Sequence, residues 1–258
     1  MSTTWGLRLS PMLNKVPEIT LIFWTIKILS TTVGETGADY LAVHVGADLT
    51  MACMSAFLIA ALILQLRARR YIPWIYWLTV VLVSIVGTQI TDFMSEKLEI
   101  SLYVSTAVFA CALAATFAIW YSVERTLSIR TIITSRRELF YWAAVLFTFA
   151  LGTAAGDLAT EALGLGFQLG VLAFAVLIAF IAVFYSLGVN PVLTFWLAYI
   201  LTRPLGASLG NLLSQSRHYG GVGLGTIHTS LAFLTVIVAL VAWVTFEGER
   251  GESADPAK

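Results

Sequence analysis

The sequence has few charged residues, no excess of basic over acidic side chains, and only two cysteines. Charged residues make up 12% of the 258 positions and hydrophobic residues 59%, proportions that exclude a water-soluble globular protein. The fifteen basic and fifteen acidic residues balance, so the chain lacks the electrostatic footprint of a nucleic-acid-binding protein. Cys53 and Cys111 lie far apart in apolar runs, which excludes a disulfide framework and predicts two inert packing thiols.

Long apolar segments are abundant instead. A helix needs about 20 mostly apolar residues to cross a bilayer. Five stretches meet this requirement directly: 73–91, 100–121, 139–158, 166–187 and 222–246. Three further stretches are short or carry charged residues and need independent support: 19–38, 51–66 and 191–213.

An internal repeat supplies that support. An aromatic residue precedes a tryptophan at the start of each odd-numbered span: Phe23-Trp24, Tyr76-Trp77, Tyr141-Trp142 and Phe195-Trp196. Ten residues after each tryptophan stands a glycine: Gly34, Gly87, Gly152 and Gly206. Five residues further on stands an acid or an amide: Asp39, Asp92, Asp157 and Asn211. Four occurrences of one spacing indicate tandem repeats, which we place at 17–70, 71–134, 135–189 and 190–247.

Each copy holds two spans, so successive copies enter the membrane in the same orientation. The sequence therefore predicts an all-α polytopic membrane protein with eight transmembrane helices, arranged as four parallel two-helix repeats with pseudo-four-fold symmetry. The whole chain, 1–258, forms one membrane domain in this prediction. Residues 248–258 are expected to be a disordered cytoplasmic tail.

The basic residues are distributed unequally between the two sides of the predicted membrane. Eleven fall with the termini and the loops on the same side, whereas Lys97 and Arg217 lie opposite. By the positive-inside bias, both termini are cytoplasmic. The first apolar stretch leads into Lys27, Glu35 and Asp39 instead of a cleavage site, so no removable signal peptide is expected.

With these repeats the chain resembles the bacterial family of uncharacterised membrane-anchored proteins built from four tandem two-helix repeats with a shared tryptophan. The likeness covers nearly the whole chain. It implies an eight-helix inner-membrane protein and no particular activity. Asn211 departs from the acid found in the other three copies.

The tryptophans and glycines have structural interpretations. A tryptophan at the end of a span suits the interfacial aromatic belt. Each repeat glycine is followed four residues later by a small residue, which predicts close helix packing. The stretch 206–210 reads G-x-S-x-G, but it copies this packing pattern inside a span, where the strand-to-helix turn of a serine hydrolase is not expected. No enzyme and no cofactor are predicted.

The repeat acids favour a cation site. Asp39, Asp92 and Asp157 end their helices, where the helix dipole disfavours an acid and a cation would compensate. Terminal carbonyls beside carboxylates form the oxygen-rich sites of ion transporters. The alternative places these acids in the headgroup zone, because 73–92 already spans about 29 Å.

Polar stripes at four-residue spacing extend from these acids into the spans: Lys27, Thr31, Glu35 and Asp39; Ser84, Thr88 and Asp92; Thr153 and Asp157; Arg203, Ala207 and Asn211. A buried charge near the bilayer centre costs at least about 2.5 kcal/mol, so these stripes should face a shared interior. Lys27 and Arg203 are expected to pair with Glu35 or an aspartate. A purely structural ion pair is the other interpretation.

These residues define a predicted metal site and path. The candidate ligands, Glu35, Asp39, Asp92, Asp157 and Asn211, offer hard oxygens that favour Mn²⁺ or Mg²⁺, and His44 could add an imidazole. The remaining polar and counter-ion residues of the path are Lys27, Thr31, Ser84, Thr88, Thr153, Arg203 and His228. His228 is either hydrogen-bonded within the bundle or a proton carrier. Pro204 and Gly206 form a candidate hinge in the seventh span.

The predicted function is an inner-membrane cation transporter for export or exchange of a divalent, Mn²⁺-like metal, with proton coupling as one form. Its predicted partners are the lipid bilayer and the transported cation. Two alternatives stay open: a pseudo-four-fold cation channel, and a scaffold or sensor that transports nothing. The direction of transport and the oligomeric state are not assigned.

Overall fold

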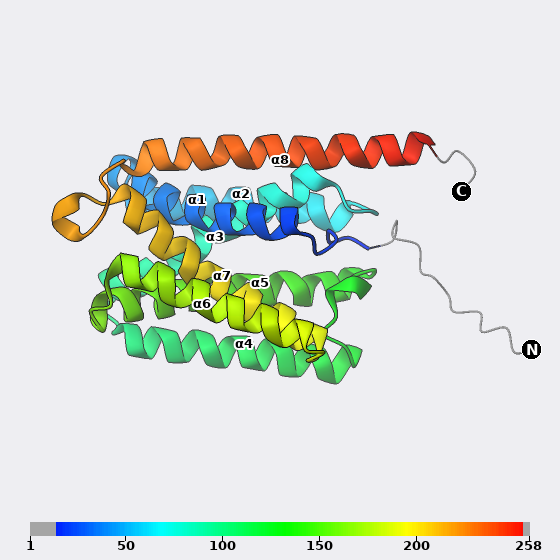
Figure 1. The fold of residues 1–258 in the computed structure, drawn as a ribbon, viewed down its shortest axis with the longest axis horizontal. Coiled ribbons are helices and arrows are strands. Elements are labelled where there is room, and N and C mark those ends of the chain that lie inside the picture. Colours follow the sequence, from blue (N-terminus) through cyan, green and yellow to red (C-terminus); the bar gives the residue numbers. More distant parts are fainter. Residues whose placement is uncertain (1–13, 255–258) are drawn as a thin grey trace, which may run out of the picture.

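The computed structural model describes residues 14–254, and the side chains of 14–247. This part of the chain is all-α and contains eight α-helices and no strand (Figure 1). The helices are α1 (Leu21–Val45), α2 (Ala47–Arg67), α3 (Pro73–Asp92), α4 (Leu102–Glu124), α5 (Ser135–Asp157), α6 (Gly166–Ser186), α7 (Pro191–Ser214) and α8 (Thr226–Ala254).

Local sequence signals begin and separate these helices. Thr20, Ser101 and Thr134 accept backbone N–H groups at the starts of α1, α4 and α5. Asn190 does the same for α7, whose first residue is Pro191. Gly46, with φ of 96°, is the single residue between α1 and α2 and allows the chain to turn there.

Seven helices, α2 to α8, are long and apolar enough to cross a membrane, as in a multi-pass membrane protein. The exception is α1, which contains Lys27, Glu35 and Asp39. The structure surrounds α1 with other helices: it packs against α2, α3, α7 and α8. Its charged residues are therefore placed among protein side chains.

The odd-numbered helices form an inner ring. α1 packs on α3, α3 on α5, α5 on α7, and α7 returns to α1. The even-numbered helices lie outside, each mainly against the odd-numbered helix of the next repeat: α2 on α3, α4 on α5, α6 on α7 and α8 on α1. These outer helices expose large apolar side chains, including Phe57, Val108, Leu172, Phe180 and Val238.

The repeat glycines make the ring contacts close. Gly34 faces Ser84, Gly87 faces Phe149, Gly152 faces Arg203 and Gly206 faces Thr31. The four contacts are equivalent. In each, the partner residue stands three positions before the repeat glycine of its own helix. A Cβ on any of the four glycines would lie closer than 3.0 Å to that neighbour. This bears out the packing role expected for the glycines.

The repeat aromatic residues join the N-terminal ends of the same four helices. Ring centroids lie 5.6 Å apart for Phe23 and Trp77, 5.5 Å for Tyr76 and Trp142, 6.2 Å for Tyr141 and Trp196, and 5.7 Å for Trp24 and Phe195. We call this closed set of eight residues the aromatic collar. Trp77, Trp142 and Trp196 are buried in it, so the interpretation of these three as an interfacial belt was wrong: they pack on aromatic partners of adjacent helices.

Two further expectations differ from the structure. α8 continues to Ala254, past the start of the predicted disordered tail at 248, since extending an existing helix costs little; residues 255–258 lie outside the described residues. Cys53 and Cys111 are exposed on the outer helices α2 and α4 and are not packing thiols of the interior.

Candidate functional site

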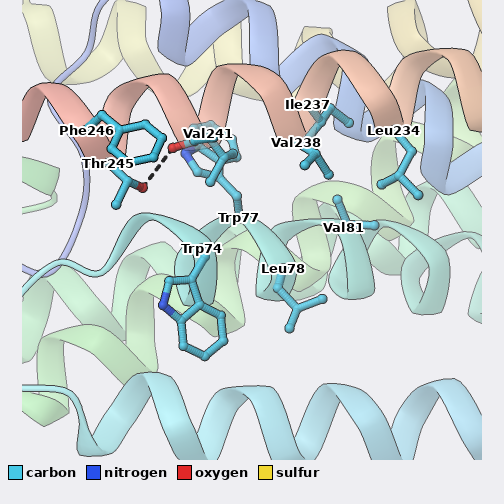
Figure 2. A pocket seen from close by; sticks show the side chains of 11 residues that line it. Trp74, Trp77, Leu78, Val81, Leu234, Ile237, Val238, Val241, Thr245 and Phe246 are labelled. Atoms are coloured by element: carbon cyan, nitrogen blue, oxygen red, sulfur yellow. Dashed lines mark hydrogen bonds between the residues drawn. The ribbon is translucent and has the colours of Figure 1, made fainter.

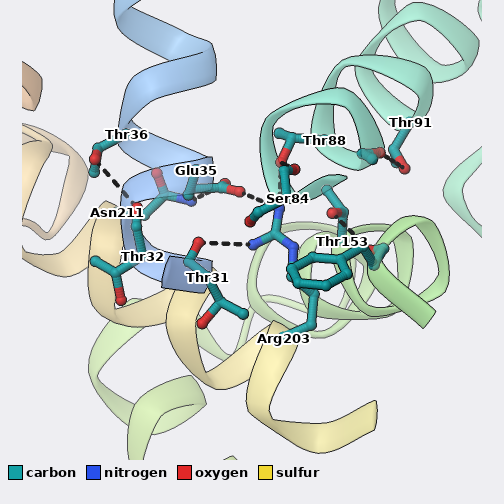
Figure 3. A network of polar contacts seen from close by, with 12 residues as sticks. Thr31, Thr32, Glu35, Thr36, Ser84, Thr88, Thr91, Thr153, Arg203 and Asn211 are labelled. Atoms are coloured by element: carbon teal, nitrogen blue, oxygen red, sulfur yellow. Dashed lines mark hydrogen bonds and ion pairs between the residues drawn. The ribbon is translucent and has the colours of Figure 1, made fainter. Parts of the chain in front are cut away.

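The centre of the site is a buried ion pair between α7 and α1. Arg203 is fully buried, and its Nη2 lies 2.8 Å from Oε2 of Glu35, which is 5% exposed (Figure 3). The other carboxylate oxygen of Glu35 accepts a hydrogen bond from Nδ2 of Asn211 at 3.0 Å. The pairing expected for Arg203 is therefore confirmed. Burying two charges is costly, so such a pair is by itself weak evidence for stability.

Two more ring helices, α3 and α5, contact Arg203. Its Nη2 also donates to the hydroxyl of Thr88 on α3, and its Nη1 donates to the backbone carbonyl of Thr31 at 3.4 Å (Figure 3). The aliphatic part of Arg203 contacts Gly152 of α5. All four odd-numbered helices thus meet at this residue, while its Nε has no hydrogen-bond partner among the described residues.

The hydroxyls of the polar stripes bond mostly to the backbone. Thr31 Oγ1 donates to the carbonyl of Ile28 at 2.6 Å and lies 3.2 Å from the carbonyl of Thr202. Thr153 Oγ1 donates to the carbonyl of Phe149. Ser84 is buried against Gly34, and its hydroxyl has no hydrogen-bond partner within the described chain. All of these groups are buried, and Thr88 bonds Arg203 directly; their role in a cation path stays a prediction.

Lys27 does not pair with an acid, which corrects the expectation made for it. Its side chain is fully buried, and its Nζ lies 3.9 Å from the ring centroid of Phe149 and 4.2 Å from that of Tyr199. Nζ has no hydrogen-bond partner among the described residues. Glu35 lies two helical turns along the same helix, about 12 Å away by the helical rise, and Arg203 already binds it. Aromatic faces replace the carboxylate that the sequence led us to expect.

The repeat aspartates lie in the C-terminal halves of three ring helices, at the end of the ring that we call the acidic end. Asp92 and Asp157 are the last residues of α3 and α5, whereas Asp39 lies inside α1, which continues to Val45, so the expectation that Asp39 ends its helix was wrong. Asp39, Asp92 and Asp157 are half-buried, and their side chains make no hydrogen bond or ion pair within residues 14–247. All three interact electrostatically with Glu35 and with Arg203. The sequence predicts that these acids lie in one region, and their electrostatic interactions with the same two residues agree with that prediction.

Two acids at this end were missed by the sequence argument. Glu96 and Glu161 interact electrostatically with the repeat aspartates and lie on π-helical segments, Phe93–Lys97 and Leu158–Ala162, that directly continue α3 and α5. Each stands four residues after its repeat aspartate. This recurring D-x3-E spacing in the sequence could have identified both glutamates as candidate site residues. π-Helical turns are frequent at functional sites.

The candidate ligands do not form a metal centre as they stand. Within the part of the chain that the structure describes, no group of three or more His, Cys, Asp or Glu residues is arranged to hold a metal ion. Glu35 and Asn211 are bonded to each other, and the three aspartates lie near them without a direct bond. The metal-ligand assignment of these five residues stays a prediction.

His44 and His228 are both exposed and lie away from Arg203. His228 is exposed near the start of α8, and its Nδ1 lies 3.1 Å from the carbonyl of Leu224. His44 is exposed at the end of α1, where its ring stacks on Tyr40. Neither residue touches Glu35 or Arg203, so the structure places His228 away from the predicted path.

The candidate hinge lies inside a continuous helix. α7 runs unbroken from Pro191 to Ser214 with Pro204 in its interior. Pro204 is buried and packs against Gly152 and Gly156 of α5. Because proline cannot donate a hydrogen bond, one turn of α7 lacks its usual bond directly beside Arg203. The hinge role of Pro204 and Gly206 stays a prediction.

A second polar network, absent from the sequence argument, lies at the start of α5. Glu138 Oε2 lies 2.5 Å from Nζ of Lys15, and its Oε1 accepts a hydrogen bond from Gln65 at 3.1 Å. Lys15 also donates to the backbone carbonyl of Leu66 at 3.1 Å. Between Lys15 and Glu138 lie more than a hundred residues of chain, so local spacing contains no signal for this pair.

An apolar cavity of 410 Å³ lies between α3 and α8, outside the ring (Figure 2). Trp74, Trp77 and Leu78 line it from α3, and Val238 and Phe246 are among its lining residues on α8. Thr245 is its one lining residue with a polar side chain, and that hydroxyl donates to the carbonyl of Val241. Nothing in this lining could hold an ion, so the cavity is separate from the polar site.

Comparison with known proteins supports the repeat structure. No curated protein and no solved structure matches the chain. The family model described as Repeat of Unknown Function (DUF347) matches four times, at residues 22–71, 75–126, 140–187 and 194–249. These matches cover most of the chain and confirm the four tandem repeats. The chain therefore belongs to the DUF347 family, a repeat family of unknown function.

Proposed function

We propose that the chain is a bacterial inner-membrane transporter that moves a cation, with Glu35 at the centre of the cation site. The observation that carries this proposal is the Arg203–Glu35 ion pair, which is buried among the four ring helices one helical turn from Asp39. Three half-buried aspartates, whose side chains have no bonded partner in the part of the chain that the structure describes, interact electrostatically with this pair. Intramembrane ionisable residues of this kind mark ion pathways.

In the proposal all eight helices cross the membrane, and the four repeats stand around a pseudo-four-fold axis. The glycine contacts and the aromatic collar support this arrangement, because each joins one ring helix to the next through the same repeat positions. α1 can cross with its charges because they face Arg203, Phe149 and Tyr199.

The aromatic collar faces the cytoplasm in this proposal, and the acidic end faces outward. The eleven basic residues on the termini and on the loops at the collar end support that orientation, against Lys97 and Arg217 at the other end. Five carboxylates then concentrate cations at the outer entrance, above the buried Glu35: those of Asp39, Asp92, Glu96, Asp157 and Glu161.

Arg203 acts as an internal counter-ion in this mechanism. It neutralises Glu35 while the site is empty, and an arriving cation competes for the same carboxylate. Carboxylate and amide oxygens are the ligands of hard divalent ions, so Mn²⁺ or Mg²⁺ is the expected cargo. Because the acids do not form a metal centre in this structure, they must draw together when Arg203 leaves. The proposed hinge at Pro204 and Gly206 lies next to Arg203, where it could allow that movement.

Uptake of Mn²⁺ and Mg²⁺ into proteoliposomes, with and without a pH gradient, tests the proposal. The unmodified protein should show saturable uptake, and Glu35→Gln should reduce it to the level of empty liposomes. Asp48→Asn is the matched control: Asp48 lies at the same end but is exposed and pairs with Lys97 outside the ring. Equal uptake by protein and empty liposomes contradicts transport and favours the scaffold or sensor.

A pseudo-four-fold channel is the second candidate, favoured by the equivalent ring contacts of the four repeats. It predicts flux that rises linearly with cation concentration and does not respond to a pH gradient. The unequal composition of the four stripes, with Arg203 in one and Glu35 in another, favours the transporter.

A further inference from the structure

We propose that the apolar cavity between α3 and α8 binds an acyl chain of a phospholipid whose headgroup contains a primary ammonium, as in phosphatidylethanolamine. This surface lies outside the ring, so its role does not depend on cation transport. The lining is aliphatic or aromatic except for Thr245, whose hydroxyl donates to the carbonyl of Val241. A hydrocarbon chain suits such a lining, because it needs no hydrogen-bond partner.

The cavity has the length of one membrane leaflet. α8 packs mainly along α1 and less closely on α3, which leaves space between α8 and α3. Trp74 and Phe246 lie at one end of this space, and Val81 and Leu234 lie toward the other (Figure 2). Leu234 and Phe246 are about 18 Å apart along α8. Half of the hydrocarbon core of a bilayer is about 15 Å thick, so one acyl chain can extend along the whole lining.

The end of the cavity at Trp74 and Phe246 has the features of a membrane–water interface. Trp74 is the second residue of α3 and is 53% exposed, and amphipathic aromatic rings concentrate at interfaces. Apolar lining gives way to charged residues here on both helices: Arg69 stands in the connection that leads into α3, and Glu247 follows Phe246 on α8. A lipid chain in the cavity therefore has its headgroup at this end.

Charges of both signs flank the headgroup end. Arg67 and Arg69 on one side and Glu247 on the other are exposed, and none of the three makes a side-chain hydrogen bond or ion pair within residues 14–247. Arg69 stands five residues before Trp74, so their Cα atoms are at most about 18 Å apart.

These charges select the headgroup. Guanidinium groups bind phosphate, and a carboxylate accepts hydrogen bonds from an ammonium. A headgroup with a phosphate and a primary ammonium satisfies both sides. Phosphatidylglycerol has no cation for Glu247, and the ammonium of phosphatidylcholine has no N–H to donate.

Native mass spectrometry of the purified full chain tests the inference, because it counts bound lipids and reports the oligomeric state together. The protein in mild detergent is titrated with phosphatidylethanolamine, phosphatidylcholine and phosphatidylglycerol of identical acyl chains. One phosphatidylethanolamine should bind about tenfold more tightly than either other lipid. Glu247→Ala should remove the preference over phosphatidylcholine. The double variant Arg67→Gln, Arg69→Gln should weaken the binding of all three lipids.

Val238→Trp tests the cavity itself. The larger ring should occupy the space and prevent tight lipid binding, and since Val238 is 60% exposed the helix packing is retained. Val108→Trp is the matched control, because Val108 is an exposed valine of the outer helix α4 away from the cavity. Arg130→Gln is the control for the arginines, since Arg130 is exposed in the connection between α4 and α5. Both controls should bind lipid as the unmodified protein does.

Three results would overturn the inference. Equal affinity for the three lipids, or tighter binding of phosphatidylglycerol, would remove the proposed headgroup selection. Unchanged binding by Val238→Trp would place the lipid elsewhere. A dimer that Val238→Trp dissociates would assign the cavity to a second copy of the chain.

Discussion

Within the described residues, the buried ion pairs of Lys15 with Glu138 and of Arg203 with Glu35 differ in the bonding of their basic groups. In the Lys15–Glu138 pair both carboxylate oxygens are bonded, and the ammonium has a second acceptor in the carbonyl of Leu66. In the Arg203–Glu35 pair the carboxylate is also fully bonded, but Arg203 Nε and the nearby ammonium of Lys27 have no partner within the described chain. A buried polar group without a partner costs free energy that packing alone does not return.

The difference separates a structural role from a functional one. The Lys15–Glu138 pair joins the segment before α1 to α2 and α5, and its charges balance one to one. Around Arg203, the aspartates on one side and Lys27 on the other have no bonded partner among the side chains of 14–247. Such an arrangement has more than one way to distribute its charges, which is the requirement for a site that binds and releases an ion.

Neutralising each acid gives the largest expected contrast. Glu138→Gln leaves the Lys15 ammonium buried without its counter-charge, so the free energy of unfolding should fall by about 3 kcal/mol. Cation uptake per folded molecule should be unchanged. Glu35→Gln should abolish uptake. Unfolding in a denaturing detergent series and uptake in proteoliposomes measure the two effects. Loss of uptake in both variants with equal destabilisation would mean that both pairs are structural.

Removing each base sharpens the same contrast. Arg203→Met takes away the cation that competes for Glu35, so the affinity for Mn²⁺ should rise about tenfold, or about 1.4 kcal/mol. Lys15→Met should leave that affinity unchanged and lower stability instead. Calorimetric titration of both variants measures the dissociation constants. An unaltered or weaker affinity in Arg203→Met would show that Arg203 does not compete with the cation.

Of the two pairs, the one formed by Arg203 could be predicted from the sequence. The four-residue spacing of polar positions and the cost of burying charge required Arg203 to meet an acid across helices, and it meets Glu35. The tandem repeats predicted the eight helices, including α1, whose charges keep it from being recognised by hydropathy alone. The spacing of polar residues predicts which side chains face the interior when all residues on one face of a helix have the same surroundings.

Other features depend on which helices become neighbours, and no local pattern specifies that. Lys27 was expected to pair with an acid, but two aromatic rings from α5 and α7 occupy its surroundings. A tryptophan at a helix end is equally compatible with the membrane interface and with packing inside the protein. The structure buries Trp142 in the aromatic collar. The Lys15–Glu138 pair joins segments that are distant in sequence, so it left no periodic trace.

The close helix contacts around Arg203 predict a smaller effect on stability. Gly34→Ala would place a methyl group into Ser84 and should lower the free energy of unfolding by about 1 to 3 kcal/mol. Gly37→Ala, on the same helix, meets only Ile85 at 4.0 Å and should raise it by about 0.5 to 1 kcal/mol, because alanine favours the helix. Thermal unfolding in detergent measures both. Equal changes in the free energy of unfolding would show that the contact between Gly34 and Ser84 can adjust to a methyl group without destabilising the protein.

The exposed ion pair of Lys97 and Asp48 should contribute least to stability of the three pairs compared. Their side chains are 52% and 74% exposed, so water and salt screen the attraction that burial preserves in the other two pairs. Asp48→Asn should change the free energy of unfolding by less than about 1 kcal/mol, and the difference should shrink as salt is added. Cation uptake should stay at the level of the unmodified protein, because Glu35 and the five carboxylates of the acidic end remain. A marked loss of uptake in this variant would extend the cation site beyond the ring, and Asp48 would then belong with the acids that surround Arg203.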